Sequence, residues 1–131
     1  MNIPEELRYS DDHEWVRVEG GEAVVGISAF AVEQLGDIVF VELPDPGAIF
    51  GAGDAFGVIE SAKAASDLLL PVGGAVIASN PALNDSPELV NDDPYGEGWL
   101  VRITLADAAQ VDTLVDTLKD AAAYRAMIAE E

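Results

Sequence analysis

The shortness of its apolar segments is the strongest constraint on what this chain can fold into. The longest runs, Ile38–Val41 and Leu68–Val72, are separated by Gly, Pro and Asp residues. Runs this short cannot span a bilayer, and short β-branched runs between turn residues are typical of antiparallel strands. The 131 residues are enough for one domain, and no Ser-rich or Pro-rich linker divides them. We therefore expect a single domain over residues 1–131, built as a sandwich or barrel of short antiparallel strands.

Local patterns predict where several elements begin and end. Alternating or β-branched residues predict four strands, at Glu14–Glu19, Glu22–Ile27, Asp37–Leu43 and Trp99–Leu105. The Gly20-Gly21 pair can form the tight turn of a hairpin between the first two strands. Ser28 can cap a short helix near 28–35, and Gly36 can end it.

The hydrophobic period changes near the C-terminus. Apolar residues recur at helical spacing over 111–118, and Asp120 can cap a final helix. We therefore expect a helical tail over about 107–130 that packs on a mainly β core.

The charge of the chain narrows its possible partners. Twenty-five Asp and Glu against six Lys and Arg give a formal net charge of −19. Binding to nucleic acid or to an anionic membrane needs clustered cations, so we expect neither partner. The chain has no Cys and one His, so we expect no thiolate nucleophile and no Cys-based or multi-histidine metal site, and hence no bound metal. A lone His without a nucleophile partner is more often structural, so we expect no catalytic residue. The first residues lack the features of a secretory signal or a transit peptide, so we expect a bacterial cytoplasmic location.

One of the two lysines lies in an unusual setting. Lys63 is surrounded by the small side chains of 61–66, at the tip of a predicted hairpin over about 56–72. A catalytic lysine would be buried, with a lowered pKa, whereas small neighbours leave this amine open to a modifying enzyme. The setting indicates covalent attachment of a carried group, and Glu60 and Asp67 on either side would orient the modifying enzyme.

The segment around Lys63 resembles the lipoyl-attachment segment of the glycine cleavage system H protein family. Three further blocks resemble the same family in the same order, and together the blocks extend from about Tyr9 to Ile103. The matching blocks are His13–Val16, Gln34–Pro44, Gly57–Asp67 with Pro71–Gly74, and Asp85–Asn91 with Asp93–Leu100.

This resemblance implies a lipoyl-domain-like barrel-sandwich hybrid that carries lipoate as an amide on Lys63. It implies a monomeric carrier and not an enzyme. Such a carrier takes the aminomethyl group of glycine from a PLP-dependent glycine decarboxylase to a tetrahydrofolate-dependent aminomethyltransferase. Dihydrolipoamide dehydrogenase, with FAD and NAD, then reoxidises it, and a lipoate ligase or octanoyltransferase supplies the arm.

The resemblance also implies a cleft in which the loaded arm rests, beside His13 and Glu14. The aminomethyl amine is cationic, so Glu14 or Asp67 could pair with it in a partly dry cleft. His13 would border this cleft, and Asp12 lies next to it in the sequence.

Three other functions share parts of this pattern. A lipoyl domain of an oxo-acid dehydrogenase would lack the blocks around Trp15 and over Tyr95–Trp99. A lipoyl relay that supplies lipoate to other complexes has the same attachment motif, so the motif does not separate it from the carrier. A biotin carrier typically has Met on both sides of the modified lysine, whereas here Ala62 and Ala64 flank Lys63.

Overall fold

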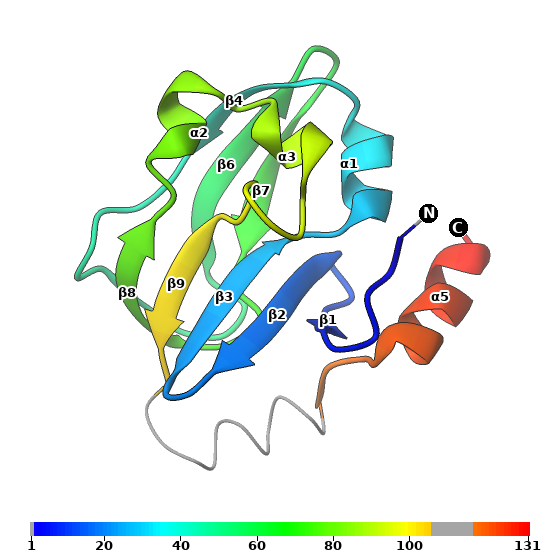
Figure 1. Cartoon of the computed structure of the whole chain (residues 1–131), viewed down its shortest axis with the longest axis horizontal. Coiled ribbons are helices and arrows are strands. Elements are labelled where there is room, and N and C mark those ends of the chain that lie inside the picture. The colour runs from blue at the N-terminus through cyan, green and yellow to red at the C-terminus, as the bar shows by residue number, and fades with distance from the viewer. Residues whose placement is uncertain (1, 106–116) are drawn as a thin grey trace.

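Two antiparallel sheets form the framework of the computed structural model, which describes residues 2–105 and 117–131 (Figure 1). Within these residues, the larger sheet has the order β1-β2-β3-β9-β8-β5 and the smaller one the order β4-β6-β7. The larger sheet consists of β1 (Arg8–Tyr9), β2 (Glu14–Glu19), β3 (Glu22–Ile27), β9 (Val101–Thr104), β8 (Gly74–Ser79) and β5 (Ile49–Phe50). The smaller sheet consists of β4 (Ile38–Glu42), β6 (Ala55–Ser61) and β7 (Ala65–Leu69). The expected barrel-sandwich of short antiparallel strands is confirmed.

The helices of the described residues lie at the margins of the sheets. They are α1 (Ala29–Leu35), α2 (Ala82–Asp85), α3 (Leu89–Asp92) and α5 (Ala121–Ala129). Helix α2 contacts β4, α3 contacts α1, and α5 contacts β1 at the side where both chain ends lie (Figure 1). The sequence patterns predicted α1 and α5 but not the single turns α2 and α3.

Apolar side chains bury both faces of the larger sheet. One face packs against the smaller sheet through residues that include Val25, Ile103, Ile59 and Leu68. The other face carries Trp15, Val24 and Tyr9, which pack with Ala121 and Tyr124 of α5. Strand β3 is therefore buried from Ala23 to Ile27, as expected for a strand covered on both sides.

The β2–β3 hairpin has the predicted bounds, and one glycine explains how it accommodates a large side chain. Gly20 takes the left-handed conformation in the turn, with φ at 64°. Trp15 is fully buried and lies opposite Gly26 in the register. A Cβ on Gly26 would lie 2.5 Å from the Trp15 ring, so only glycine leaves room for the indole. The indole nitrogen donates to the Pro94 carbonyl at 3.0 Å.

Helix α1 begins and ends as the sequence predicts. The Ser28 hydroxyl accepts a hydrogen bond from the Ala31 amide at 3.2 Å. Gly36 closes the helix with φ at 84°, and its amide donates to the Val32 carbonyl at 2.9 Å.

Other predicted bounds differ from those observed. The hairpin around Lys63 pairs Ala55–Ser61 with Ala65–Leu69, so it ends before the predicted limit near residue 72. Pro71 explains the early end, because its ring nitrogen cannot donate to a strand partner. Strand β9 begins two residues after Trp99, because the Trp99 amide donates to the Gly96 carbonyl within a turn.

Only part of the predicted helical tail can be compared with the structure. Residues 106–116, which include most of the 111–118 pattern, lie outside the described residues. The final helix is α5, and the Asp120 carboxylate accepts from the Ala123 amide at 2.8 Å, as its cap position predicts.

Candidate functional site

Lys63 lies at a tightly closed hairpin tip between β6 and β7. The Ser61 amide donates to the Ala64 carbonyl at 2.7 Å, and the Ser61 hydroxyl accepts from the Lys63 and Ala64 amides. The Ala62 amide donates to the Asp37 carbonyl at 3.1 Å, which ties the tip to the start of β4. Hydrogen bonds of the backbone and of the Ser61 hydroxyl therefore hold the backbone at Lys63, while its side chain is exposed.

The stem of Lys63 passes close to the glycine that ends α1. A Cβ on Gly36 would lie 3.4 Å from Lys63 Cε, so Gly36 leaves space for the stem as well as ending the helix. Lys63 forms no ion pair with any residue of 2–105 or 117–131. Its amine therefore stays accessible at the end of α1.

A cleft of about 180 Å³ lies between α1 and the hairpin that carries Lys63. Its walls come from the start of β2, the end of β3, α1 and the β6–β7 hairpin. The lining residues are Asp12, His13, Glu14, Ile27, Ala31, Gln34, Leu35, Ile59, Ser66, Asp67 and Leu68. Gly36 lies five positions after Ala31, roughly 7.5 Å along the helix axis, so an arm on Lys63 could turn back into this cleft.

Glu14 is the buried polar group of the cleft. Glu14 is only 3% exposed, and within residues 2–105 and 117–131 its Oε1 atom has no hydrogen-bond partner. Burial and, to a smaller degree, the nearby Asp12 carboxylate raise the pKa of Glu14 from 4.5 to about 9, and a hydrogen bond with Ser10 partly opposes this shift. At neutral pH the carboxyl group is therefore protonated, with one oxygen free to meet an incoming donor.

His13 borders the cleft, but its ring nitrogens point to the C-terminal helix. Nδ1 hydrogen bonds with the Tyr124 hydroxyl at 2.8 Å, and Nε2 lies 3.5 Å from Glu131 Oε1. The Tyr124 hydroxyl also hydrogen bonds with Ser28 at 2.6 Å. His13 has φ at 71°, a conformation that few side chains adopt, so these contacts hold a strained turn in place.

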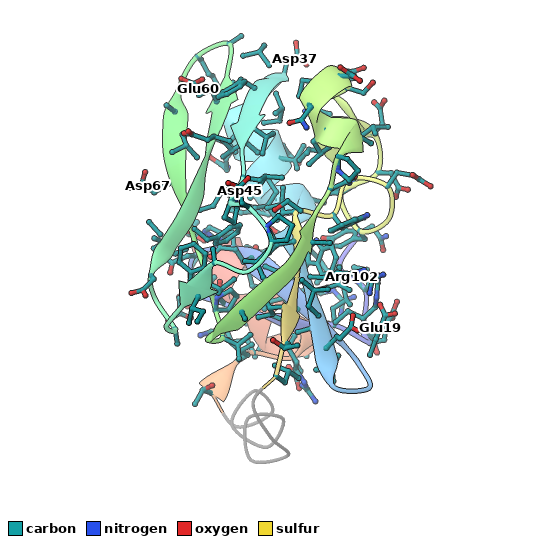
Figure 2. All side chains as sticks on the ribbon, turned by 90° about the vertical axis from the view of Figure 1, so that its left-hand side faces the viewer. Glu19, Asp37, Asp45, Glu60, Asp67 and Arg102 are labelled. Atoms are coloured by element: carbon teal, nitrogen blue, oxygen red, sulfur yellow. The ribbon has the colours of Figure 1, made fainter. Side chains whose placement is uncertain are left out.

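The predicted site residues fall into two groups. The structure brings Asp12, His13, Glu14 and Asp67 together around the cleft. Glu60 does not line it, since it lies on the central strand β6 and faces outward with Phe40, whereas Asp67 reaches the cleft from the edge strand β7. Figure 2 shows Glu60 and Asp67 at different heights along the hairpin, with Glu60 toward the tip.

Sequence reasoning missed the part of the cleft wall that α1 supplies. Ala31, Gln34 and Leu35 line the cleft from successive turns of this helix. Their i, i+3 and i+4 spacing indicates a common helix face, but nothing in the sequence says what that face meets. Tyr124 was missed for a related reason, because its contact with His13 joins residues 111 positions apart.

Residues 2–105 and 117–131 contain no group of three or more His, Cys, Asp or Glu side chains placed to hold a metal ion. No helix among them is long and apolar enough to cross a membrane.

Comparisons with known proteins agree along almost the whole chain. The glycine cleavage H-protein family model matches residues 7–131. The glycine cleavage system H protein of Bacteroides fragilis is 52% identical over 128 residues, which are 98% of each chain. The H protein of Magnetococcus marinus is 57% identical over 115 residues, 88% of this chain and 82% of that protein. The crystal structure of the Mycobacterium marinum H protein superposes with a TM-score of 0.83 at 36% identity, covering 97% of this chain and 99% of the other. The chain therefore belongs to the glycine cleavage H-protein family.

Proposed function

We propose that Lys63 carries lipoate through an amide bond and that the cleft beside α1 receives the end of the loaded arm. The protein then acts as the lipoyl carrier of the glycine cleavage system. The observation that supports this proposal best is the accessible amine of Lys63 on a rigid hairpin tip, next to a cleft with a buried, unpaired carboxyl oxygen.

The residues of the cleft fit lipoate. Ile27, Leu35, Ile59 and Leu68 supply apolar walls suited to an alkyl chain with a dithiolane ring. When attached, lipoate supplies a disulfide that accepts the aminomethyl group of glycine and is left reduced once that group has been passed on. Lys63 positions the arm, and the apolar walls exclude water from its end.

Glu14 and Asp67 supply the polar recognition. A primary ammonium group that enters the cleft would meet the free Glu14 oxygen, and its positive charge would favour the ionised carboxylate. Asp67 is exposed at the mouth and can accept a second hydrogen bond. His13 holds the turn that carries Glu14, since its nitrogens are engaged with α5. Asp12 adds negative charge.

The partners follow from this role. The decarboxylase, the aminomethyltransferase and dihydrolipoamide dehydrogenase act at the arm, and a lipoate ligase or octanoyltransferase attaches it. Glu60 and Asp67 flank Lys63 along the hairpin and serve as landmarks for the attaching enzyme. We place the protein, as a monomer, in the bacterial cytoplasm, in keeping with its bacterial relatives.

The carrier role is tested by a glycine-dependent decarboxylation assay with purified partner enzymes. Wild-type chain that has been lipoylated should support turnover, whereas Lys63→Arg should remain unmodified by intact mass and support none, because arginine cannot form the amide. Lipoylated chain that supports no glycine turnover would contradict the carrier role and favour a relay of lipoate. Lipoate found on Lys119 by peptide mapping would contradict the attachment site.

The cleft is tested by the lifetime of the loaded arm. We expect Glu14→Gln and Asp67→Asn to release ammonia several-fold to a hundred-fold faster than wild type in the absence of the transferase. This range corresponds to a loss of roughly 1–3 kcal/mol of charge-assisted hydrogen bonding. Lipoylation itself should be unchanged in Glu14→Gln. Equal lifetimes in wild type and both variants would remove these carboxyl groups from the proposal.

A further inference from the structure

Two large apolar side chains next to the lysine tip are open to solvent. Val39 is 56% exposed and Phe40 is 50% exposed. Strand β4 pairs Ile38 with Ser61 and Phe40 with Glu60, so Val39 is an extra residue in a β-bulge. Regular alternation would turn one of two neighbouring side chains toward the core, whereas the bulge leaves both on the outside.

This bulge lies directly beside Lys63. Its neighbour Ile38 pairs with Ser61, the last residue of β6, and the Asp37 carbonyl accepts from the Ala62 amide. From strand spacings, the Val39–Phe40 patch lies on the order of 10 Å from Lys63. An enzyme that approaches the lysine from the β4 edge of this sheet passes over the patch.

Carboxylates surround the patch. Phe40 is in register with Glu60 and Ala65, and Glu42 is in register with Val58 and Asp67. Strands β4, β6 and β7 contain no Lys or Arg. Figure 2 shows Asp37 and Glu60 near the tip end of the molecule, well away from Arg102 and Glu19. The outward face of the smaller sheet is thus an apolar centre with an acidic rim, a composition typical of protein contact surfaces.

We propose that the Val39–Phe40 patch, with its rim of Asp37, Glu42 and Glu60, is the docking site of the enzyme that acylates Lys63. The complementary surface on that enzyme is an apolar pocket bordered by Lys or Arg side chains. This inference rests on the proposed attachment of lipoate to Lys63.

The reason to assign the patch to this partner is reach. Enzymes that act on the far end of the arm can stay at a distance from the hairpin. The acylating enzyme must bring its activated acyl carbonyl to Lys63 Nζ itself. The neutral amine attacks the carbonyl carbon of an acyl-adenylate, and the amide C–N bond forms. The bond between this carbon and the phosphate oxygen of AMP breaks, and the amine loses a proton to solvent. Only this step requires contact with the surface beside the tip.

The test compares the double variant Val39→Ser/Phe40→Ser with Ile49→Ser. Ile49 is 80% exposed on β5 of the other sheet, so it controls for the loss of exposed apolar surface. The unmodified full chain is incubated with a bacterial lipoate ligase, lipoate and ATP, and modification is followed by intact mass. We expect kcat/KM to fall about 10-fold for the double variant, mainly through KM, and to change less than 2-fold for Ile49→Ser. Phe40→Leu should recover part of the loss.

Direct binding supplies a readout that does not depend on catalysis. The Kd of the unmodified chain for the ligase without ATP should rise by a similar factor in the double variant. Equal melting temperatures of the double variant and Ile49→Ser would show that the fold is unchanged. If the double variant melts at a lower temperature, Phe40→Leu alone serves as the test instead. It keeps a large apolar side chain and should show a smaller loss of kcat/KM and of affinity for the ligase.

The outcomes separate this inference from the carrier proposal. A wild-type chain that is not acylated at Lys63 would overturn the proposed function. Acylation of the wild type with unchanged kcat/KM and Kd in the double variant would overturn the docking site alone. Unchanged acylation together with a raised KM for the glycine decarboxylase would also overturn it and would assign the patch to the decarboxylase.

Discussion

Glu14 gives the fold a pH dependence of stability opposite in sign to that of a salt-bridged carboxylate. In the unfolded chain its carboxyl group ionises above about pH 4.5, whereas in the folded chain burial keeps it protonated up to about pH 9. Between these values the unfolded state binds fewer protons than the native state, so stability falls as pH rises. Below pH 4.5 both states hold the proton and this contribution disappears.

Glu14→Gln should therefore stabilise the unloaded protein at neutral pH. We expect its free energy of unfolding to exceed that of wild type by about 1–3 kcal/mol at pH 7.5, with the difference vanishing near pH 4. Urea unfolding at several pH values measures it. Glu33→Gln, at an exposed position on α1, is the matched control and should follow wild type at every pH. A difference between Glu14→Gln and wild type that does not change with pH would show that the buried carboxyl group is not the cause.

The same residue joins stability to recognition. A carboxyl group with an unpaired buried oxygen destabilises the fold, and here it lies where the arm would end. Removing it should make the empty protein more stable and the loaded arm less well held. Such opposite effects of one substitution are typical of a binding residue and would not follow from a purely structural role.

At the scale of elements, the packing of the β2–β3 hairpin depends on the absence of a side chain at Gly26. Trp15 fills the space that a Cβ on Gly26 would occupy. Gly26→Ala should therefore lower the free energy of unfolding by about 1–3 kcal/mol or more, because the indole is fully buried and hydrogen bonded to Pro94. Gly21→Ala is the matched control, because a Cβ there meets no atom within 4 Å and its φ is not positive.

Thermal or urea unfolding of both variants measures this difference. Near-ultraviolet circular dichroism would report whether the Trp15 environment changes in Gly26→Ala. If the two alanine variants unfold at the same denaturant concentration, the close packing of Trp15 on Gly26 does not stabilise the hairpin.

Elements were predictable where local chemistry determines them. Alternation and paired glycines define the β2–β3 hairpin, and the Ser28 and Asp120 caps begin their helices at the expected positions. The bulge at Val39 was not predictable, because it depends on the register between β4 and β6 and not on the residues of β4 alone. The single-turn helices α2 and α3 also escaped prediction, since one turn leaves too few residues for a periodic pattern.

For the site, sequence reasoning placed the lysine on a hairpin and named the polar residues of the cleft. Small side chains around Lys63 are a local signal, and the resemblance to a family supplied Glu14 and Asp67. The sequence could not show that a Glu14 oxygen is buried without a hydrogen-bond partner, or that the His13 ring contacts Tyr124. Burial and contacts between distant residues arise from tertiary packing, which one sequence does not display.

At the scale of the whole molecule, charge is distributed unevenly. Within the part of the chain that the structure describes, four of the six cations are paired with carboxylates: Arg17 and Arg102 on the larger sheet, and Lys119 and Arg125 near the C-terminus. The smaller sheet presents carboxylates without a compensating cation in its strands. With a formal net charge of −19, partner enzymes should be steered toward this side by basic surfaces.

Association with partners should therefore slow as ionic strength rises. Between about 0.01 M and 0.15 M salt the Debye length falls from roughly 30 Å to 8 Å, so long-range steering is largely lost. We expect the association rate constant with the lipoate ligase to fall several-fold over this range, as measured by stopped-flow or surface binding. Glu42→Gln should reduce this salt dependence more than Glu88→Gln, which removes an exposed charge next to α3. A rate constant independent of salt would exclude electrostatic steering.

Because the amine of Lys63 forms no ion pair with the described residues, lipoylated and unmodified chains should be equally stable. No ion pair with the described residues is broken when this amine becomes an amide, so the modification releases no internal contact. Unmodified and modified chains should then melt within about 1 °C of each other in an oxidised, unloaded state, because solvent-exposed changes rarely alter stability. Proteases that remove unstable proteins would not distinguish them. The unmodified form would therefore persist and compete with the lipoylated form for binding to the partner enzymes. Its abundance would depend on the supply of acyl groups alone.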